Sequence, residues 1–262
     1  MSSDYGFIVD AIKFSHSSTS TFENCPYSFK LMYIDALPRE NNFYGEFGTL
    51  IHLCLEKYFT GELEAYELSG YYKQTYDTIV KSAPPPYPVG IDLKYKEQGQ
   101  YFFDFFYFEK EKYDVLATED MLEFDLNGLT VVARPDLVLK EKESKNILLY
   151  DYKTAAPFWK DKKTGKEITD VSKMDGYYKQ MFIYTYALRK QKNIAIDEIA
   201  LWFTRLDKTV IVPWSLEKET EAIYELEKTI DKIKTAEDFP FNNSNSFFCN
   251  NLCGSRLFCE FR

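Results

Sequence analysis

The sequence lacks any long apolar run: no stretch of 18 or more apolar residues occurs in its 262 positions, so we expect no transmembrane helix. Met1 to Asp10 lack both a basic start and an apolar core. We therefore expect no secretory signal peptide and a cytoplasmic protein. Internal repeats and low-complexity segments are absent too, and 45% of the residues are hydrophobic, which excludes wholesale disorder.

Cysteines are few and odd in number, which together with the missing signal peptide argues against a disulfide framework and for metal binding. Cys249, Cys253 and Cys259 lie within 11 residues near one end of the chain, and Cys25 lies near the other. Four thiolates can hold an iron–sulfur cluster or a tetrahedral zinc ion, and cysteines alone do not choose between them. We expect the fifth, Cys54, to be a small buried apolar residue.

An excess of basic residues is also missing, because the net charge is −9. Taken alone, this argues against non-specific binding of nucleic acid. The segment Pro157–Lys192, called the basic strip below, nevertheless holds nine Lys/Arg against four Asp/Glu. Such a strip can bind a phosphate backbone, or it can simply be a solvated loop and helix face.

The hydrophobic pattern predicts an α/β protein of one domain, 1–262. It has a helical part at about 15–112, a core with a small mixed sheet flanked by helices at about 113–235, and a cysteine tail at 239–262. The expected helices are Ser20–Tyr33 with a break at Cys25-Pro26, Phe47–Phe59, Glu62–Lys81, Lys94–Lys112, Gly176–Lys192 and Leu216–Lys234. The expected strands are Val115–Leu126, Leu129–Lys140, Asn146–Lys153, Ile196–Arg205 and Thr209–Trp214, with a hairpin turn at Asn127-Gly128 and a loop from Ala155 to about Asp175.

Two acids and a lysine mark the ends of neighbouring strands. Asp151 and Lys153 are two positions apart on one strand, so both side chains point to the same face, with the Tyr152 carbonyl beside them. Asp136, which we expect on the preceding strand, can approach Asp151 if the two strands pair. Carboxylates this close repel each other and favour a bound divalent cation. Such a cation can activate water against a phosphodiester, although Asp-x-Lys also occurs in surface ion pairs.

Two helices carry polar pairs at i and i+4. His52 and Glu56 share one face of the expected helix Phe47–Phe59, and His52 can give a neutral imidazole to the same metal. The only other histidine is His16. Gln180 and Tyr184 share a face of a later helix, where they either support the metal site or pack as ordinary amphipathic residues.

Taken together, these residues resemble the PD-(D/E)XK nuclease superfamily, and within it the iron–sulfur, RecB-like branch. That branch includes the AddB nuclease domain and stand-alone CRISPR-associated and phage exonucleases. The resemblance runs from Ser15 to Cys259, nearly the whole chain. Its pieces, in the family's order, are the stretch Ser17–Phe29 around Cys25, Gly48…His52…Glu56, Arg134-Pro135-Asp136, Asp151-Tyr152-Lys153, Gln180…Tyr184 and the three late cysteines.

The resemblance implies a restriction-endonuclease-like core and a Mg²⁺- or Mn²⁺-dependent deoxyribonuclease, most simply an exonuclease of recombination, repair or phage DNA processing. It implies a metal held by His52, Asp136, Asp151 and the Tyr152 carbonyl, with Lys153 assisting the attacking water. Glu56, Arg134, Gln180 and Tyr184 are then expected to support the site or contact DNA, and Cys25, Cys249, Cys253 and Cys259 to hold a [4Fe–4S] cluster.

The sequence departs from the usual family pattern at three places. The late cysteines are separated by three and then five residues rather than two and five, the second acid is Asp151 rather than Glu, and Arg134 replaces a glycine. No helicase motif is present, so we expect a stand-alone nuclease of a bacterium or phage, working beside a separate helicase or recombination protein. Two alternatives stay open: a non-catalytic DNA-binding or assembly module of the same fold, and a structural zinc protein.

Overall fold

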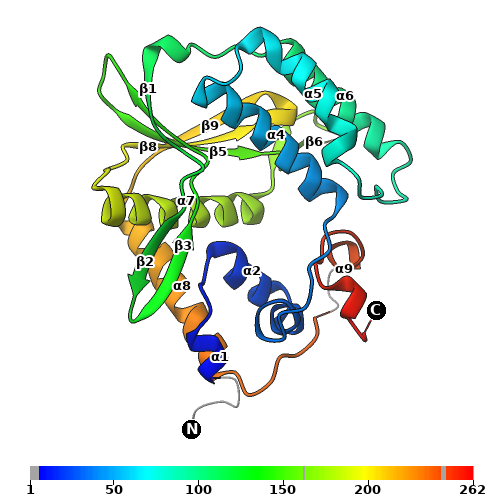
Figure 1. Cartoon of the computed structure of the whole chain (residues 1–262), viewed down its shortest axis with the longest axis vertical. Coiled ribbons are helices and arrows are strands. Elements are labelled where there is room, and N and C mark those ends of the chain that lie inside the picture. The colour runs from blue at the N-terminus through cyan, green and yellow to red at the C-terminus, as the bar shows by residue number, and fades with distance from the viewer. Residues whose placement is uncertain (1–5, 162, 243–245, 262) are drawn as a thin grey trace.

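A mixed five-stranded sheet forms the centre of the protein in the computed structural model, which describes residues 6–161, 163–242 and 246–261. Its strands lie in the order β1-β4-β5-β8-β9, and only β5 and β8 are parallel (Figure 1). Their bounds are β1 Tyr113–Thr118, β4 Leu137–Glu141, β5 Ile147–Lys153, β8 Glu198–Phe203 and β9 Lys208–Pro213. This is the small mixed sheet that the sequence predicted.

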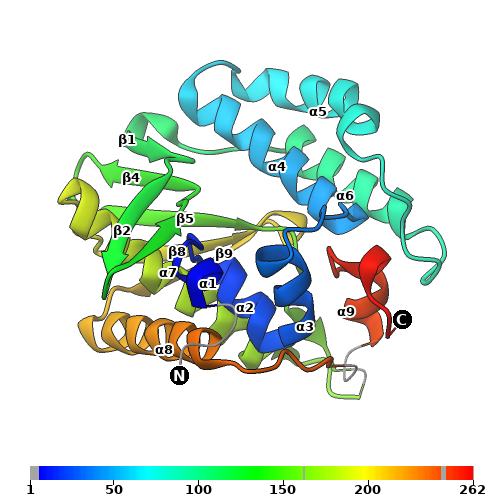
Figure 2. The same cartoon turned by 60° about the horizontal axis from the view of Figure 1, so that its bottom comes forward.

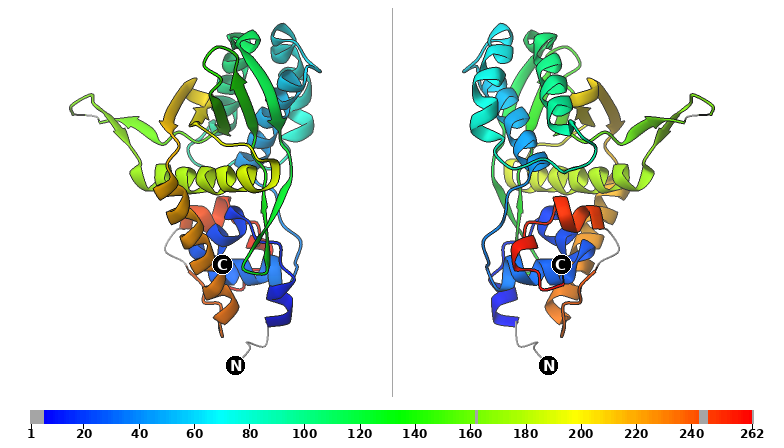
Figure 3. Two further views of the ribbon diagram at one scale, coloured as in Figure 1. Left: turned by 90° about the vertical axis from the view of Figure 1, so that its left-hand side faces the viewer. Right: turned by 90° about the vertical axis from the view of Figure 1, so that its right-hand side faces the viewer.

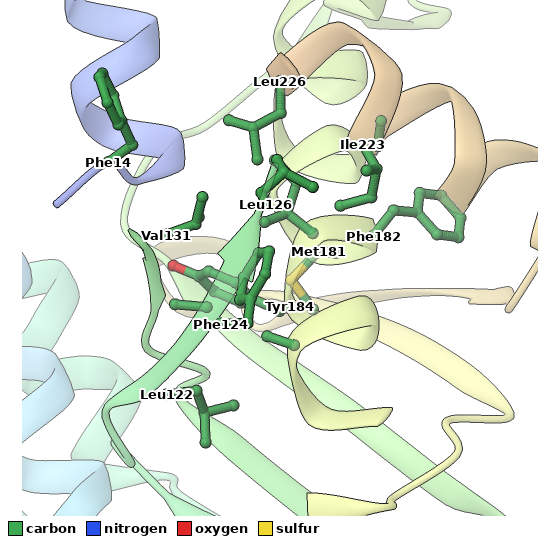
Figure 4. Packing of buried hydrophobic residues seen from close by; sticks show 14 of the residues in the cluster. Phe14, Leu122, Phe124, Leu126, Val131, Met181, Phe182, Tyr184, Ile223 and Leu226 are labelled. Atoms are coloured by element: carbon green, nitrogen blue, oxygen red, sulfur yellow. The ribbon is translucent and has the colours of Figure 1, made fainter. Parts of the chain in front are cut away.

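The helix α7 (Val171–Lys192) makes the crossover between the two parallel strands and packs on one face of the sheet, with α8 (Leu216–Thr235) against it. A separate hairpin, β2 (Leu122–Leu126) with β3 (Leu129–Ala133), closes the same core. Figure 4 shows Phe124 and Val131 of this hairpin meeting Met181 of α7. The predicted turn is confirmed, because Asn127 and Gly128 both have the positive φ that such a two-residue turn requires.

On the other face, α4 (Phe43–Thr60), α5 (Ala65–Ile79) and α6 (Ile91–Asp104) build a second core that is rich in aromatic rings (Figure 1). These three helices are called the cap below. The predicted helix Lys94–Lys112 is too long at its end. Instead the chain leaves the helix after Asp104, and the rings of Phe106 and Phe108 stack on Trp202 of the sheet. None of the helices in the described part of the chain combines the length and the apolar character needed to cross a bilayer.

Two predicted strands are interrupted, and both interruptions lie at the same place. The expected strand Val115–Leu126 breaks at Glu119, which has a φ of 49°, and the expected strand Leu129–Lys140 breaks around Pro135. Asp136 therefore lies in a bend rather than on a strand, which corrects the sequence-based expectation. The two bends hold each other, because the Glu119 N–H donates to the Asp136 carbonyl at 3.1 Å.

The expected loop Ala155–Asp175 contains structure that the sequence did not predict. Strands β6 (Phe158–Lys160) and β7 (Glu167–Thr169) pair as a hairpin that projects from the molecule (Figure 3). The helix α7 also begins five residues early, at Val171, because Asp170 caps it by accepting from the Lys173 N–H. Residue 162, part of the basic strip, lies outside the described residues.

The late helix α9 lies beside the helices of the first forty residues (Figure 2). The expected break at Cys25-Pro26 is confirmed: α2 ends at Asn24, and Cys25 caps the next helix. The terminal and short helices are α1 Gly6–Asp10, α2 His16–Asn24, α3 Pro26–Phe29, η1 Lys30–Ile34, η2 Lys110–Lys112, η3 Thr204–Leu206, α9 Ser246–Asn251 and η4 Arg256–Phe258.

Close packing of α5 against α6 provides a test of the cap. A Cβ added at Gly99 would lie 2.4 Å from the hydroxyl oxygen of Tyr72, which is fully buried and donates to the Lys96 carbonyl. We expect Gly99→Ala to lower the free energy of unfolding by about 1–3 kcal/mol, because overpacking outweighs the better helix propensity of alanine. Urea denaturation measures this.

Gly70 on α5 is the matched control, since nothing lies within 4 Å of an added Cβ there. Gly70→Ala should raise the free energy of unfolding by up to about 1 kcal/mol. Equal effects of the two substitutions would contradict the proposed helix contact.

Candidate active site

Two carboxylates meet where β4 begins and β5 ends. Leu137 pairs with Tyr150 in the sheet, so Asp136 and Asp151 occupy the next positions of the two chains. Both are buried, and Asp136 Oδ2 accepts from the Tyr152 N–H at 2.6 Å. Burial, followed by the charge of Asp151, raises the pKa of Asp136 to about 7. The fold therefore holds two acids in an environment that favours a positive charge between them.

Lys153 lies beside this pair and reaches across to α7. Its Nζ is 2.5 Å from Asp151 Oδ2 and donates to Gln180 Oε1 at 2.7 Å. Gln180 in turn donates to the Tyr184 hydroxyl at 2.7 Å. The two polar residues of α7 thus extend from the lysine in a chain of hydrogen bonds, as the sequence-based site required. This arrangement fixes the ammonium group while leaving 14% of the side chain exposed.

His52 reaches the same place from α4, on the opposite side of the sheet edge. Its Nε2 lies 3.1 Å from the Tyr152 carbonyl oxygen, and its Nδ1 lies 3.5 Å from Asp136 Oδ1. Burial alone lowers the pKa of His52, but the charge of Asp136 and the hydrogen bond to Glu119 raise it to about 9. In the absence of a cation the imidazole is therefore held in its protonated form by the surrounding acids.

Glu119 is a site residue that the sequence-based set did not include. Its Oε1 is 3.1 Å from His52 Nδ1, while its Oε2 is 2.9 Å from Arg134 Nε. One ligand atom each from His52, Glu119 and Asp136 lie within 4.8 Å of one another, a possible metal site. The only sequence signal for Glu119 is a Glu-Asp pair inside an otherwise strand-like stretch.

The histidine side of the centre opens into a pocket of about 430 Å³. Glu56 and Arg134 line it together with His52 and Glu119, so both expected supporting residues lie at the site. On the far side His16 begins α2, and burial followed by the charges of Lys153 and Lys179 lowers its pKa to about 4. The second histidine is therefore neutral and lies within electrostatic reach of Lys153.

The four expected ligand cysteines come together at a separate place. Cys25, Cys249, Cys253 and Cys259 line one cavity of about 210 Å³, beside the aromatic rings of Tyr27, Phe241, Phe248 and Phe261. No three of these sulfurs, all in the described part of the chain, lie within 4.8 Å of one another. Cys54 lies elsewhere, fully buried in α4, where burial raises its pKa to about 12.

The basic strip is partly neutralised by acids. Lys179 pairs with Glu23 and Glu225, while Arg189 and Lys192 pair with Glu219 and Asp120. These contacts favour a solvated, ion-paired surface over a continuous phosphate track along α7. Other members of the strip lie on the projecting hairpin and at the start of α7.

Comparison with solved structures finds a "Putative exonuclease" from Eubacterium rectale with a TM-score of 0.53 and 14% identity, covering 97% of this chain and 90% of that one. At this identity the likeness concerns the fold alone. A second structure, SSO0001, has 14% identity and a TM-score of 0.33, over 93% of this chain and 94% of that one, and no argument rests on it. No match is found among curated proteins.

A comparison with protein families gives a match to the PD-(D/E)XK nuclease superfamily over residues 13–262. The match includes the acidic pair, Lys153 and His52, and the mixed sheet flanked by helices agrees with the restriction-endonuclease-like core of this family. The chain therefore belongs to the PD-(D/E)XK nuclease superfamily.

Proposed function

We propose that the protein is a divalent-metal-dependent deoxyribonuclease that removes nucleotides from DNA ends. The single observation that carries this proposal is the meeting of Asp136, Asp151 and Lys153 at one sheet edge. The Eubacterium rectale neighbour, named a "Putative exonuclease", shares the fold, and exonuclease action itself is favoured by the resemblance to RecB-like exonucleases. A role in recombination, repair or phage DNA processing, beside a separate helicase, belongs to the same proposal.

The donor set at the acidic pair fits Mg²⁺ or Mn²⁺, which prefer hard oxygen ligands and tolerate imidazole. We infer that His52 Nε2, Asp136, Asp151 and the Tyr152 carbonyl hold the ion. Neighbouring ligands of an octahedral ion at about 2.1 Å are separated by about 3 Å. The 3.1 Å between His52 Nε2 and the Tyr152 carbonyl fits that spacing. Asp151 Oδ2 is buried and lacks a well-aligned hydrogen bond, and it can bind the ion beside its ion-pair partner Lys153 Nζ, which lies 2.5 Å away.

When bound, the cation lowers the pKa of a water molecule and offsets the charge that develops on the phosphate. The protein's own groups then complete the reaction. Lys153, held by Gln180, is placed to orient the attacking water and to stabilise the pentacoordinate phosphate by donating a hydrogen bond. Arg134, at the rim of the pocket, can reach a phosphate oxygen once it leaves Glu119. Water attacks the phosphorus and loses a proton to solvent, the ester P–O bond breaks, and the leaving oxygen takes a proton from solvent.

Glu119 fits the role of a residue that positions His52. Metal-bound histidines commonly donate their second ring N–H to a carboxylate, which fixes the direction of the ring. Here Nε2 faces the Tyr152 carbonyl, and Nδ1 faces Glu119 at 3.1 Å. We therefore infer that Glu119 acts on the metal through His52.

We also propose that the four cysteines hold a [4Fe–4S] cluster. In a tetrahedral zinc site with Zn–S distances of about 2.3 Å, the sulfurs lie about 3.8 Å apart. In a cubane each cysteine binds a different iron, so the sulfurs stand wider. The gathering of all four cysteines around one cavity of about 210 Å³ supports a bound metal group there, and the resemblance to the iron–sulfur branch favours the cluster over zinc.

The nuclease proposal is tested with end-labelled single-stranded and duplex DNA in Mg²⁺, in Mn²⁺ and in EDTA. We expect cleavage that EDTA abolishes and that Lys153→Ala lowers by at least about a hundredfold, because the phosphate loses its nearest donor. Lys163→Ala, on the exposed turn of the projecting hairpin, should cleave normally. A Lys153→Ala protein with full activity would sink the proposed mechanism. Metal-dependent DNA binding with no cleavage would favour the non-catalytic module instead.

The role of Glu119 is tested by Mn²⁺ titration calorimetry. Glu119→Gln should weaken Mn²⁺ binding by about 10- to 100-fold, because the His52 ring loses its partner. In the double variant with His52→Ala, the second substitution should add little, since both act through one ring. Full additivity would show that Glu119 binds the ion itself, contrary to our inference.

The cluster is tested on protein purified without oxygen. We expect a brown protein with about four iron and four sulfide per chain, and loss of both in Cys253→Ser. Cys54→Ala, which changes a cysteine outside the cavity, should keep its iron. One zinc ion per chain without sulfide would refute the cluster and leave the zinc alternative.

A further inference from the structure

A third pocket lies where α4, α6, the end of β5 and α9 meet. Its volume is about 330 Å³. We call it the aromatic pocket, and its lining residues are Tyr44, Tyr95, Thr154, Ala155, Ala156, Lys173, Arg205, Phe247 and Leu252. None of the roles assigned above uses it.

This pocket is continuous with the proposed catalytic strand. Thr154 and Ala155 follow Lys153 directly in the chain. Arg205 donates to the Thr154 carbonyl at 3.2 Å and thereby fixes the chain where it leaves β5. A strand whose phosphodiester lies at Lys153 would pass the segment Thr154–Ala155, which lines the pocket.

The walls offer flat rings and positive charge together. The rings of Tyr44 and Tyr95 lie 5.4 Å apart, and Phe247 lies 6.0 Å from Tyr44 with 48% of its surface exposed. The guanidinium of Arg205 stacks 3.6 Å above the Tyr95 ring. The guanidinium itself is therefore a further flat surface. Lys173, at the start of α7, stands exposed at the edge. Rings that stack on a base and cations that meet the backbone are the features by which proteins bind unpaired nucleic acid.

We propose that the aromatic pocket binds one unpaired nucleotide of the strand being cleaved, adjacent to the scissile phosphodiester. This inference rests on the proposed nuclease function and adds its substrate class. A volume near the lower end of small-molecule sites, about 300–1,000 Å³, suits a single base rather than a base pair. A base can enter only after it leaves its partner, so the protein favours single-stranded or frayed ends.

The test measures binding of fluorescent single strands to the Lys153→Ala protein in Mg²⁺, with one abasic site moved along the strand. The abasic site should weaken binding by about tenfold at one position, because one stacked base is lost. Phe247→Ala should weaken binding of the intact strand by about tenfold and remove the effect at that position only. A blunt duplex should bind less tightly than the single strand.

Tyr66→Ala is the control, because Tyr66 is 84% exposed on α5 and lies outside the pocket. It should keep the position-specific effect. Phe247→Leu, which keeps an apolar side chain without a flat ring, should behave like Phe247→Ala and unfold at the parent temperature, which separates stacking from damage to α9. An abasic effect that survives unchanged in Phe247→Ala, or no position-specific effect at all, overturns the proposal.

This experiment does not depend on cleavage. If the parent chain fails to cut DNA but shows the position-specific effect, the nuclease proposal fails and the pocket stands as part of a DNA-binding module. If it cuts DNA without that effect, the nuclease stands and the pocket proposal fails.

Discussion

The repulsion between two buried carboxylates is the constraint around which the site is built. Asp136 and Asp151 are brought together by strand register, and Asp136 is pinned by the Tyr152 N–H. Without a cation the protein offsets their charge with a protonated His52 and with Lys153. The pKa of Asp136 is raised above its unfolded value, so the stability linked to its protonation is present in acid. That contribution is lost as the pH rises from about 4 through 7. The proposed divalent ion would replace the protons and remove this cost.

His52 lies on α4, and α4 is held in place by the other cap helices and by the tail. Asn42 caps the first turn of α4, and the preceding segment is fixed to the tail: the Glu40 N–H donates to the Gly254 carbonyl at 2.8 Å, and Arg256 pairs with Glu40. The cysteine cavity therefore lies at the base of the helix that supplies a proposed metal ligand. Through α9 it also borders the aromatic pocket. A group bound by the cysteines would stabilise both places without taking part in the reaction.

Much of the architecture could be predicted because local signals specify it. Asn127-Gly128 dictates a hairpin, Cys25-Pro26 dictates a helix break, and the alternation along β5 places Asp151 and Lys153 on one face. The hairpin β6–β7 was missed for an equally physical reason. The side chains of β7 are all exposed, so no alternation of buried and exposed positions marks that strand.

The missed parts of the site depend on distant contacts instead. The breaks at Glu119 and Pro135 are held by a hydrogen bond between the two bends, 17 positions apart in the chain. Glu119 is recognised as a site residue only by its contact with His52, which lies on α4, 67 positions away in the chain. Neither contact can be read from a local stretch of sequence. The strand pattern therefore predicted continuous strands through the two bends, although the chain leaves the sheet there and forms part of the site.

The acidic character of the protein bears on how it meets DNA. With a net charge of −9 and a basic strip partly paired with acids, most of the surface repels phosphate. Attraction must then come from a few cations close to the centre: Arg134, Lys153, Lys173 and Arg205. Of these, Lys153 and Arg205 are largely shielded from water, where a charge acts more strongly than on the surface. Such a distribution would favour binding where a strand enters the site over binding along the length of a duplex, in keeping with the proposed digestion from an end.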